Sequence, residues 1–194
     1  MRKEVFMETY SLQNDILEKL KGTKTEENLH TALSAESQAY LRYLWFSKKA
    51  KQDGYVDISR NFEEIANNEK EHAEIWFKYL GGWSSTEKNL DTAANGEHFE
   101  WDTMYFEFAE TARKEGLDAI AFLFDKIADI EKTHEIKYAT MRDAVKEGSV
   151  FTSDDANQKW VCLNCGYVVS GKEPPKICPA CSHPQGYFKK EKKC

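Results

Sequence analysis

Two Glu-x-x-His pairs are the residues of this chain best suited to chemistry. They are Glu69 with His72 and Glu131 with His134, and each pair stands inside a long stretch with helical patterning. Residues three apart lie on the same face of a helix, so each pair directs a carboxylate and an imidazole toward one point. One such pair arises by chance in many glutamate-rich helices, whereas two pairs with matched neighbours rarely do.

Further glutamates precede each pair on another predicted helix. Glu36 precedes the first pair, and Glu97 and Glu100 precede the second. Two such pairs, with glutamates from two other helices, form the ligand set of a carboxylate-bridged two-metal site in a four-helix bundle. This oxygen-rich set suits iron or manganese, whereas zinc could enter but could not change its redox state. The residues therefore predict a redox-active pair of metal ions.

A second group of candidate ligands lies near the C-terminus, where all five cysteines fall in the last 33 residues. Four of them read Cys162-x2-Cys165-x12-Cys178-x2-Cys181. In a reducing compartment such paired thiols usually hold one metal ion in a tetrahedron. This spacing also describes zinc ribbons, and by itself it favours zinc. The fifth, Cys194, ends the chain and is interpreted as a free thiol.

Four long helices must position the carboxylates and imidazoles. Glycine breaks and capping residues predict them over about 26–53, 58–80, 93–115 and 117–147, with Asp57 capping the second. The polar segment 83–92 is interpreted as the longer connection that a ferritin-like bundle needs between its second and third helices. Before residue 22, a short amphipathic helix is predicted by Leu12, Ile16, Leu17 and Leu20. The fold class predicted is all-α, a ferritin-like four-helix bundle followed by a cysteine domain.

The two predicted hairpins look like an internal repeat. Glu36 and Glu69 are 33 residues apart, and Glu97 and Glu131 are 34 residues apart. Duplication would place equivalent carboxylates on equivalent helices and build a nearly symmetric two-metal centre. Glu100 has no counterpart in the first half, so the predicted centre is asymmetric at that position.

Charge and composition restrict the class of protein. The net charge is −6, divided into −10 over residues 1–159 and +4 from Trp160 onward. An acidic body argues against nucleic-acid binding. No apolar run approaches the roughly 18 residues that span a bilayer, and the start does not resemble a signal peptide, so we expect a cytosolic protein. The predicted domains are an extension (1–22), the bundle (23–148), a linker (149–159) and a cysteine domain (160–194).

The candidate ligand segments resemble those of rubrerythrins. They read Leu33-Ser-Ala-Glu36-Ser-Gln, Asn68-Glu69-Lys-Glu-His72-Ala, Gly96-Glu97-x-x-Glu100-Trp101 and Glu131-Lys-Thr-His134-Glu. Trp160-x-Cys-x-x-Cys165-Gly-Tyr167, followed by Cys178-Pro-x-Cys181, resembles the family's rubredoxin-like module and favours iron over zinc there. The likeness extends over residues 23–190. It implies a ferritin-like di-iron bundle fused to a small four-cysteine rubredoxin-like β domain.

The resemblance also implies a role for each candidate ligand. Glu69 and Glu131 would bridge two irons. Glu36 would bind one iron together with either His72 or Glu100, and Glu97 and His134 would bind the other. A third iron per subunit would be held by four thiolates, those of Cys162, Cys165, Cys178 and Cys181. Tyr43 and Tyr105 correspond to tyrosines that hydrogen-bond near the ligands in the family.

The activity implied is that of a non-haem di-iron peroxidase. Such a protein reduces hydrogen peroxide to water in oxidative-stress defence, with electrons from reduced rubredoxin or a flavoprotein reductase entering through the four-cysteine iron. The resemblance further implies a cytoplasmic homodimer or higher homo-oligomer. Two alternatives stay open: a ferritin-like ferroxidase that handles iron, and a binding module with structural zinc.

Overall fold

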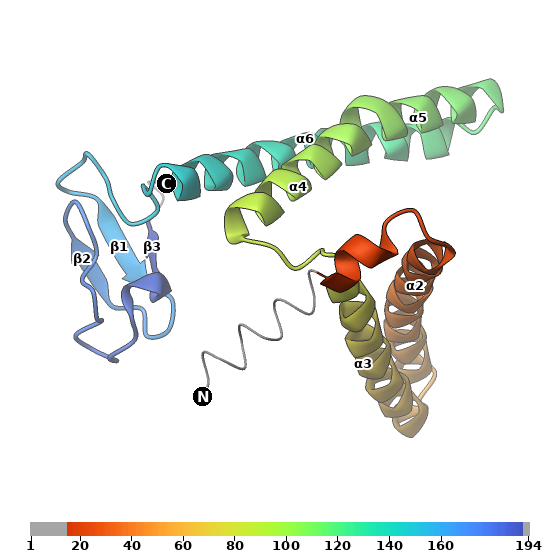
Figure 1. The fold of residues 1–194 in the computed structure, drawn as a ribbon, viewed down its shortest axis with the longest axis horizontal. Coiled ribbons are helices and arrows are strands. Elements are labelled where there is room, and N and C mark those ends of the chain that lie inside the picture. Colours follow the sequence, from red (N-terminus) through yellow and green to blue (C-terminus); the bar gives the residue numbers. More distant parts are fainter. Residues whose placement is uncertain (1–14, 192–194) are drawn as a thin grey trace. The chain divides into compact units, whose positions relative to one another are not determined.

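The computed structural model describes residues 15–191, which are mostly helical and end in a small antiparallel sheet (Figure 1). The chain divides into two compact units, Met1–Ser84 and Ser85–Cys194. The first unit holds one long helix hairpin, and the second holds another hairpin and the sheet. The predicted fold class, helices followed by a small four-cysteine β domain, is confirmed. Leu12 and Cys194 lie outside the described residues, and residues 15–20 are helical.

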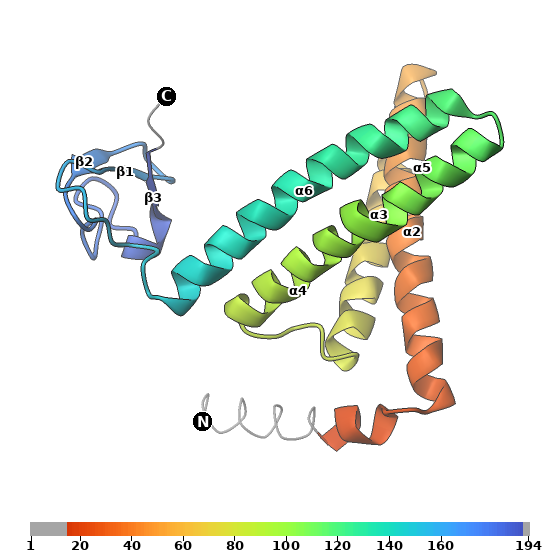
Figure 2. The ribbon, with the colours of Figure 1, turned by 90° about the horizontal axis from the view of Figure 1, so that it is seen from above.

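The first hairpin consists of α2 (Lys24–Gln52) and α3 (Val56–Tyr79), which run antiparallel (Figures 1 and 2). Thr23 caps α2 by accepting a hydrogen bond from the Glu26 backbone N–H, and the Glu26 carboxylate accepts one from the Gly22 N–H. Gly54, at φ 89°, ends the helix in the left-handed conformation that glycine adopts without strain. The two helices are therefore joined by a tight turn.

Small residues let α2 and α3 approach closely. The buried positions on these two helices are Ala39, Ser47, Ala50, Ser59 and Ala66. The Ser47 hydroxyl lies 3.0 Å from that of Ser59 and donates to Glu63 Oε1 at 2.9 Å. These hydrogen bonds pin the register of the two helices near their connected ends.

The second hairpin is interrupted on one side. It comprises α4 (Thr86–Phe99), a five-residue π turn (Glu100–Met104) and α5 (Tyr105–Lys114), which together run antiparallel to α6 (Asp118–Lys146), as Figure 2 shows. Buried alanines line this hairpin: Ala94, Ala109, Ala112 and Ala121. The sequence predicted an unbroken third helix, and that prediction is wrong at the π turn.

The connection between the hairpins is also shorter than predicted. The third helix begins at Thr86 rather than Ala93, so only residues 80–85 join α3 to α4. Ser85 accepts a hydrogen bond from the Lys88 backbone N–H and caps the helix, with Glu87 in its first turn. The polar residues that were interpreted as a loop therefore start a helix. In the second helix, Asp57 lies inside the first turn rather than at the cap.

The C-terminal sheet has three short antiparallel strands. They are β1 (Lys159–Cys162), β2 (Val168–Ser170) and β3 (Phe188–Lys190), in the order β2-β1-β3. Trp160 is fully buried and donates its indole N–H to the Gly171 carbonyl at 2.8 Å. It packs with Phe188 and two of the cysteines, so the core of this domain includes its thiols. Among the described residues, no helix is long and apolar enough to cross a membrane.

Candidate metal centres

The first hairpin brings together Glu36 of α2 and the Glu69/His72 pair of α3. One potential ligand atom from each residue lies within 4.8 Å of the others. His72 Nδ1 lies 3.1 Å from Glu69 Oε2 and 3.9 Å from Glu36 Oε2. The i, i+3 spacing places both residues of the pair on the side of α3 that faces α2, as the sequence predicted.

The second hairpin repeats this arrangement with Glu97 of α4 and the Glu131/His134 pair of α6. Their ligand atoms also lie within 4.8 Å of one another. His134 Nδ1 lies 2.6 Å from Glu131 Oε2 and 3.6 Å from Glu97 Oε2. Each hairpin thus supplies two carboxylates and one imidazole, and the internal repeat holds at the level of side-chain geometry.

The carboxyl groups in each cluster crowd one another. The pKa of Glu36 is raised above its usual value, first because it shares a hydrogen bond with Glu69 and then because burial disfavours its charge. The pKa of Glu97 is raised by burial and by a hydrogen bond with Glu131. Two carboxylates this close repel each other when both are ionised, and a bound cation would relieve that repulsion. The donor set of each cluster therefore fits a hard or borderline divalent ion such as iron or manganese.

Glu100 is not part of either three-residue cluster and begins the π turn. The Tyr105 N–H donates to the Glu100 carbonyl, five residues back, so the turn is one residue wider than an α-helical turn. This explains why the glutamate interval is 34 residues in the second hairpin and 33 in the first. The sequence showed the extra residue in this interval, but it did not predict that a π turn would accommodate it.

The same expansion places Tyr105. Tyr43 follows Glu36 by seven residues, whereas Tyr105 follows Glu97 by eight. In an uninterrupted α-helix Tyr105 would lie about 80° around the axis from Glu97, because each residue turns about 100°. The wider turn removes most of that offset. The pKa of Tyr105 is raised by burial and by the negative charges of Glu100, Glu131 and Glu97.

Tyr43 has a different environment. Its ring packs 6.4 Å from that of Phe46 and 6.2 Å from that of Phe62, in a small aromatic group on the first hairpin. Hydrogen bonding by the two tyrosines to metal ligands stays a prediction.

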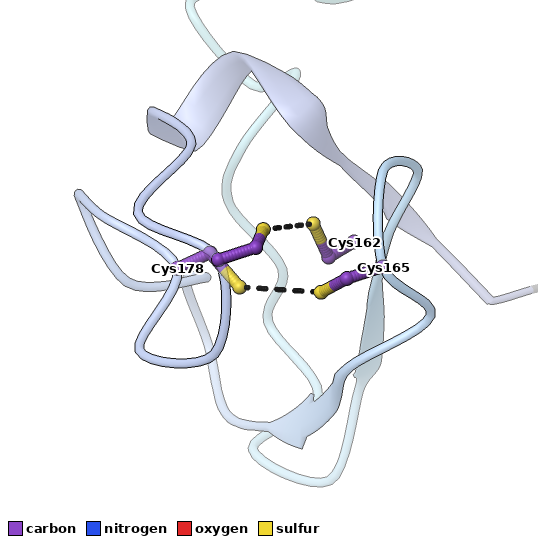
Figure 3. Close-up of side chains that lie close together, drawn as sticks. Cys162, Cys165 and Cys178 are labelled. Carbon is purple, nitrogen blue, oxygen red and sulfur yellow. Dashed lines mark hydrogen bonds between the residues drawn. The ribbon is translucent and has the colours of Figure 1, made fainter.

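The four cysteines of the C-terminal domain converge on one point. Their sulfur atoms lie within 4.8 Å of one another. The Sγ atom of Cys162 lies 3.7 Å from that of Cys181, and the Sγ atom of Cys165 lies 3.7 Å from that of Cys178. Dashed lines mark these two contacts in Figure 3. These distances suit four thiolates around one tetrahedral ion.

Two matching backbone turns present the thiols. Gly166 donates its N–H to the Cys162 carbonyl at 2.9 Å, and Ser182 donates to the Cys178 carbonyl at the same distance. Both residues have positive φ, 77° for Gly166 and 60° for Ser182. Glycine adopts this left-handed backbone without strain. The serine in the second turn was missed, because its residue type does not indicate a left-handed backbone.

Backbone hydrogen bonds to sulfur tune the cysteine site. The His183 backbone N–H bonds to Cys181 and is the main cause that lowers the pKa of this thiol to about 6. The Tyr167 N–H bonds to Cys165 and acts in the same direction, but sharing of protons with the other thiols raises the pKa of Cys165 to about 12. Without metal, Cys181 therefore ionises more readily than an ordinary thiol, and Cys165 less readily.

Known proteins share both parts of this chain. The family model described as Rubrerythrin matches residues 27–142, and the model described as "Rubrerythrin, rubredoxin-like domain" matches residues 160–189. Rubrerythrin-1 of Clostridium acetobutylicum is 44% identical over 189 residues, covering 89% of this chain and 96% of that protein. Rubrerythrin of Porphyromonas gingivalis is 44% identical over 182 residues, covering 87% and 90%. Rubrerythrin of Nitratidesulfovibrio vulgaris is 43% identical over 185 residues, covering 89% and 96%.

Proposed function

The chain belongs to the rubrerythrin family, and we propose on this basis that it reduces hydrogen peroxide to water with electrons that enter through the four-cysteine site. Family membership makes it an iron-dependent oxidoreductase with a di-iron part and a rubredoxin-like part. One observation carries the finer proposal. The chain combines two matched carboxylate–imidazole clusters with a four-thiol cluster. Loaded with iron, this combination would pair a two-electron centre with a one-electron inlet.

The two three-residue clusters would together hold a pair of iron ions, with a third iron in the thiol cluster. As the likeness to rubrerythrins implies, Glu69 and Glu131 would bridge the two ions. Glu36 would bind one iron with His72 or Glu100, and Glu97 and His134 would bind the other. When bound, two ferrous ions supply the two electrons that, with two protons, convert one peroxide molecule into two water molecules.

The protein's own groups would manage protons and water around this chemistry. The pKa values of Glu36 and Glu97 are raised in the metal-free state, so a metal ion would compete with protons for these carboxylates more than for ordinary glutamates. Tyr105 keeps its phenol proton beside the carboxylates because its pKa is raised. That hydroxyl would donate a hydrogen bond to the peroxide substrate.

Assembly and partners follow from the same proposal. Each hairpin carries exposed large apolar side chains, including Trp45 at 62% and Phe106 at 62%, which an assembly of four helices around the metal pair would cover. We propose a cytoplasmic homodimer or higher homo-oligomer. Exposed lysines of the C-terminal domain, such as Lys172 and Lys189, give a reduced rubredoxin or a flavoprotein reductase a basic surface to meet.

The runner-up function is a ferritin-like ferroxidase. It shares the carboxylate clusters, and it does not need a four-thiol site. The two are separated by supplying the iron-loaded protein with reduced rubredoxin and hydrogen peroxide, and then with excess ferrous iron and dioxygen. The proposal expects catalytic peroxide consumption and no accumulation of iron beyond about three ions per chain. Iron accumulation far above that ratio, without peroxide turnover, would favour the ferroxidase.

A matched variant pair locates the activity. Glu131→Gln removes a bridging carboxylate and should lower peroxide turnover by at least about tenfold, since even groups that only support metal ligands cost that much. Glu107→Gln changes an exposed glutamate on α5 and should leave turnover unchanged. Equal turnover by both variants would place the chemistry elsewhere.

A further inference from the structure

The π turn of the second hairpin carries one residue more than the α-helix around it. Turns of this kind are rare, and they persist where surrounding contacts support them. Here α4 and α5 both pack against α6, through Ala94 on one side of the turn and Ala109 and Ala112 on the other. The extra residue must be accommodated between these packed segments, so something must fix where it sits.

A carboxylate on α6 contacts residues within and next to the turn. Glu135 Oε2 accepts a hydrogen bond from the Trp101 indole N–H at 2.5 Å, and Glu135 Oε1 lies 3.2 Å from His98 Nδ1. His98 belongs to the last turn of α4, and Trp101 is the second residue of the π turn. One side chain thereby ties α6 to both sides of Glu100.

The contacted rings also support each other. The imidazole of His98 meets the indole of Trp101 edge to face, with centroids 5.3 Å apart and an angle of 88° between the planes. The Lys132 ammonium lies 4.6 Å from the Trp101 ring centroid on the same helix turn as Glu135. These contacts hold Trp101 in one orientation relative to α6.

The first hairpin lacks both features. Glu135 follows Glu131 by four residues, and the residue four after Glu69 is Ala73. Ser37 follows Glu36 where His98 follows Glu97. Helix α2 passes this region as an uninterrupted α-helix from Lys24 to Gln52. The carboxylate clamp and the π turn therefore occur together in one repeat and are both missing from the other.

We propose that Glu135 is a positioning residue for the two-metal centre, because its bonds to Trp101 and His98 pin the π turn between Glu97 and Tyr105. This inference rests on the two-metal centre of the proposed function. With the turn pinned, Glu97, Glu100 and Tyr105 share one side of the helix. If the turn moved toward α4, each residue it passed would rotate by about 100°, and Glu100 would leave the side of the helix that carries Glu97.

The test measures Mn²⁺ binding by electron paramagnetic resonance in protein that carries zinc in its four-cysteine site. Manganese favours oxygen and nitrogen ligands, so the signal reports the carboxylate clusters. The wild type should bind two coupled Mn²⁺ ions per chain. In Glu135→Leu, the affinity for one of the two ions should fall by about 10- to 100-fold, the usual effect of losing a group that orients a ligand. Glu135→Gln keeps an acceptor for Trp101 and should restore most of that loss.

A deletion separates positioning from general stability. Removing Asp102 shortens the interval from Glu97 to Tyr105 to the seven residues of the first hairpin, so the helix needs no π turn. Glu135→Leu should then have little further effect on Mn²⁺ binding, as a double-mutant cycle would show. Glu107→Leu, at an exposed position of α5, is the control.

Three results would overturn the inference. They are unchanged Mn²⁺ binding in Glu135→Leu, equal weakening of both ions in Glu135→Leu, and a loss of the same size with and without the deletion. A wild-type protein that binds no coupled Mn²⁺ pair would contradict the proposed two-metal centre itself, and that outcome is seen before any variant is compared.

Discussion

At the scale of single residues, the metal clusters are places where like charges are held together. Glu97 lies within ligand distance of Glu131, and Glu36 within ligand distance of Glu69. In each case the pKa of a carboxyl group is raised. Without metal these groups oppose folding at neutral pH. As metal ligands, on the proposed function, they would link the affinity for the ion to stability.

Replacing one of these carboxyls should make the metal-free protein less sensitive to pH. Because the pKa of Glu97 is raised on folding, its stabilising contribution is fully present below the ordinary value of 4.5 and is lost as pH rises through the raised value. In Glu97→Gln this loss is absent. The melting temperature of the variant, relative to that of the wild type, should therefore be higher at pH 7 than at pH 5. Thermal melts in chelator would measure the difference. A difference that is constant with pH, or larger at pH 5, would contradict this cause.

The cysteine cluster makes a second prediction at this scale. Thiolates, not thiols, react with alkylating agents. Cys181 has its pKa lowered to about 6 while the pKa of Cys165 is raised to about 12, although Cys165 is the more exposed of the two. In reduced, metal-free protein at pH 7, iodoacetamide should therefore modify Cys181 before Cys165. Mass spectrometry of peptides after a short exposure to iodoacetamide would show which cysteine is alkylated earlier. Faster labelling of Cys165 would mean that exposure, rather than hydrogen bonding to sulfur, governs reactivity.

At the scale of elements, each hairpin depends on a few small buried contacts. Ser47 and Ser59 are each 3% exposed, and their hydroxyls join α2 to α3 beside Glu63. Ser47→Ala removes the hydroxyl that contacts both neighbours and should cost about 1–2 kcal/mol. The melting temperature should fall by roughly 2–4 °C per kcal/mol for a chain of this size.

The matched control is Ser34→Ala, which changes an exposed serine of the same helix that accepts from Gln38. Its cost should stay within about 0.5 kcal/mol. Equal losses at the two positions would show that the buried hydroxyl contacts contribute little.

The sequence predicted the elements where local rules decide them. Glycine at positive φ ends helices, and Glu-x-x-His spacing sets a shared face, so the helix ends and both clusters were accessible from residue types. The start of α4 was missed because Ser85 serves equally well in a loop and as a helix cap. The π turn was missed because its support comes from Glu135, 34 residues away along the chain from Trp101.

At the scale of the whole molecule, the account joins two kinds of metal chemistry on one chain. The carboxylate clusters belong to the part matched over residues 27–142, and the thiols to the part matched over residues 160–189. On this proposal, the two parts are fused because the thiolate iron replaces the electrons that the helical part gives to peroxide. Removing either part should therefore stop turnover while leaving the other part able to bind its metal.

The most direct test is a single turnover followed by stopped-flow absorption. Anaerobic, iron-loaded protein that has been fully reduced is mixed with one equivalent of hydrogen peroxide, and the visible colour of the oxidised four-cysteine iron is recorded. We predict that the colour appears rapidly in the wild type and at least about tenfold more slowly in Glu131→Gln, which keeps every cysteine. Wild-type protein that stays colourless, or a variant that colours as fast as the wild type, would contradict electron transfer from the thiolate iron to a peroxide-reducing centre in the bundle.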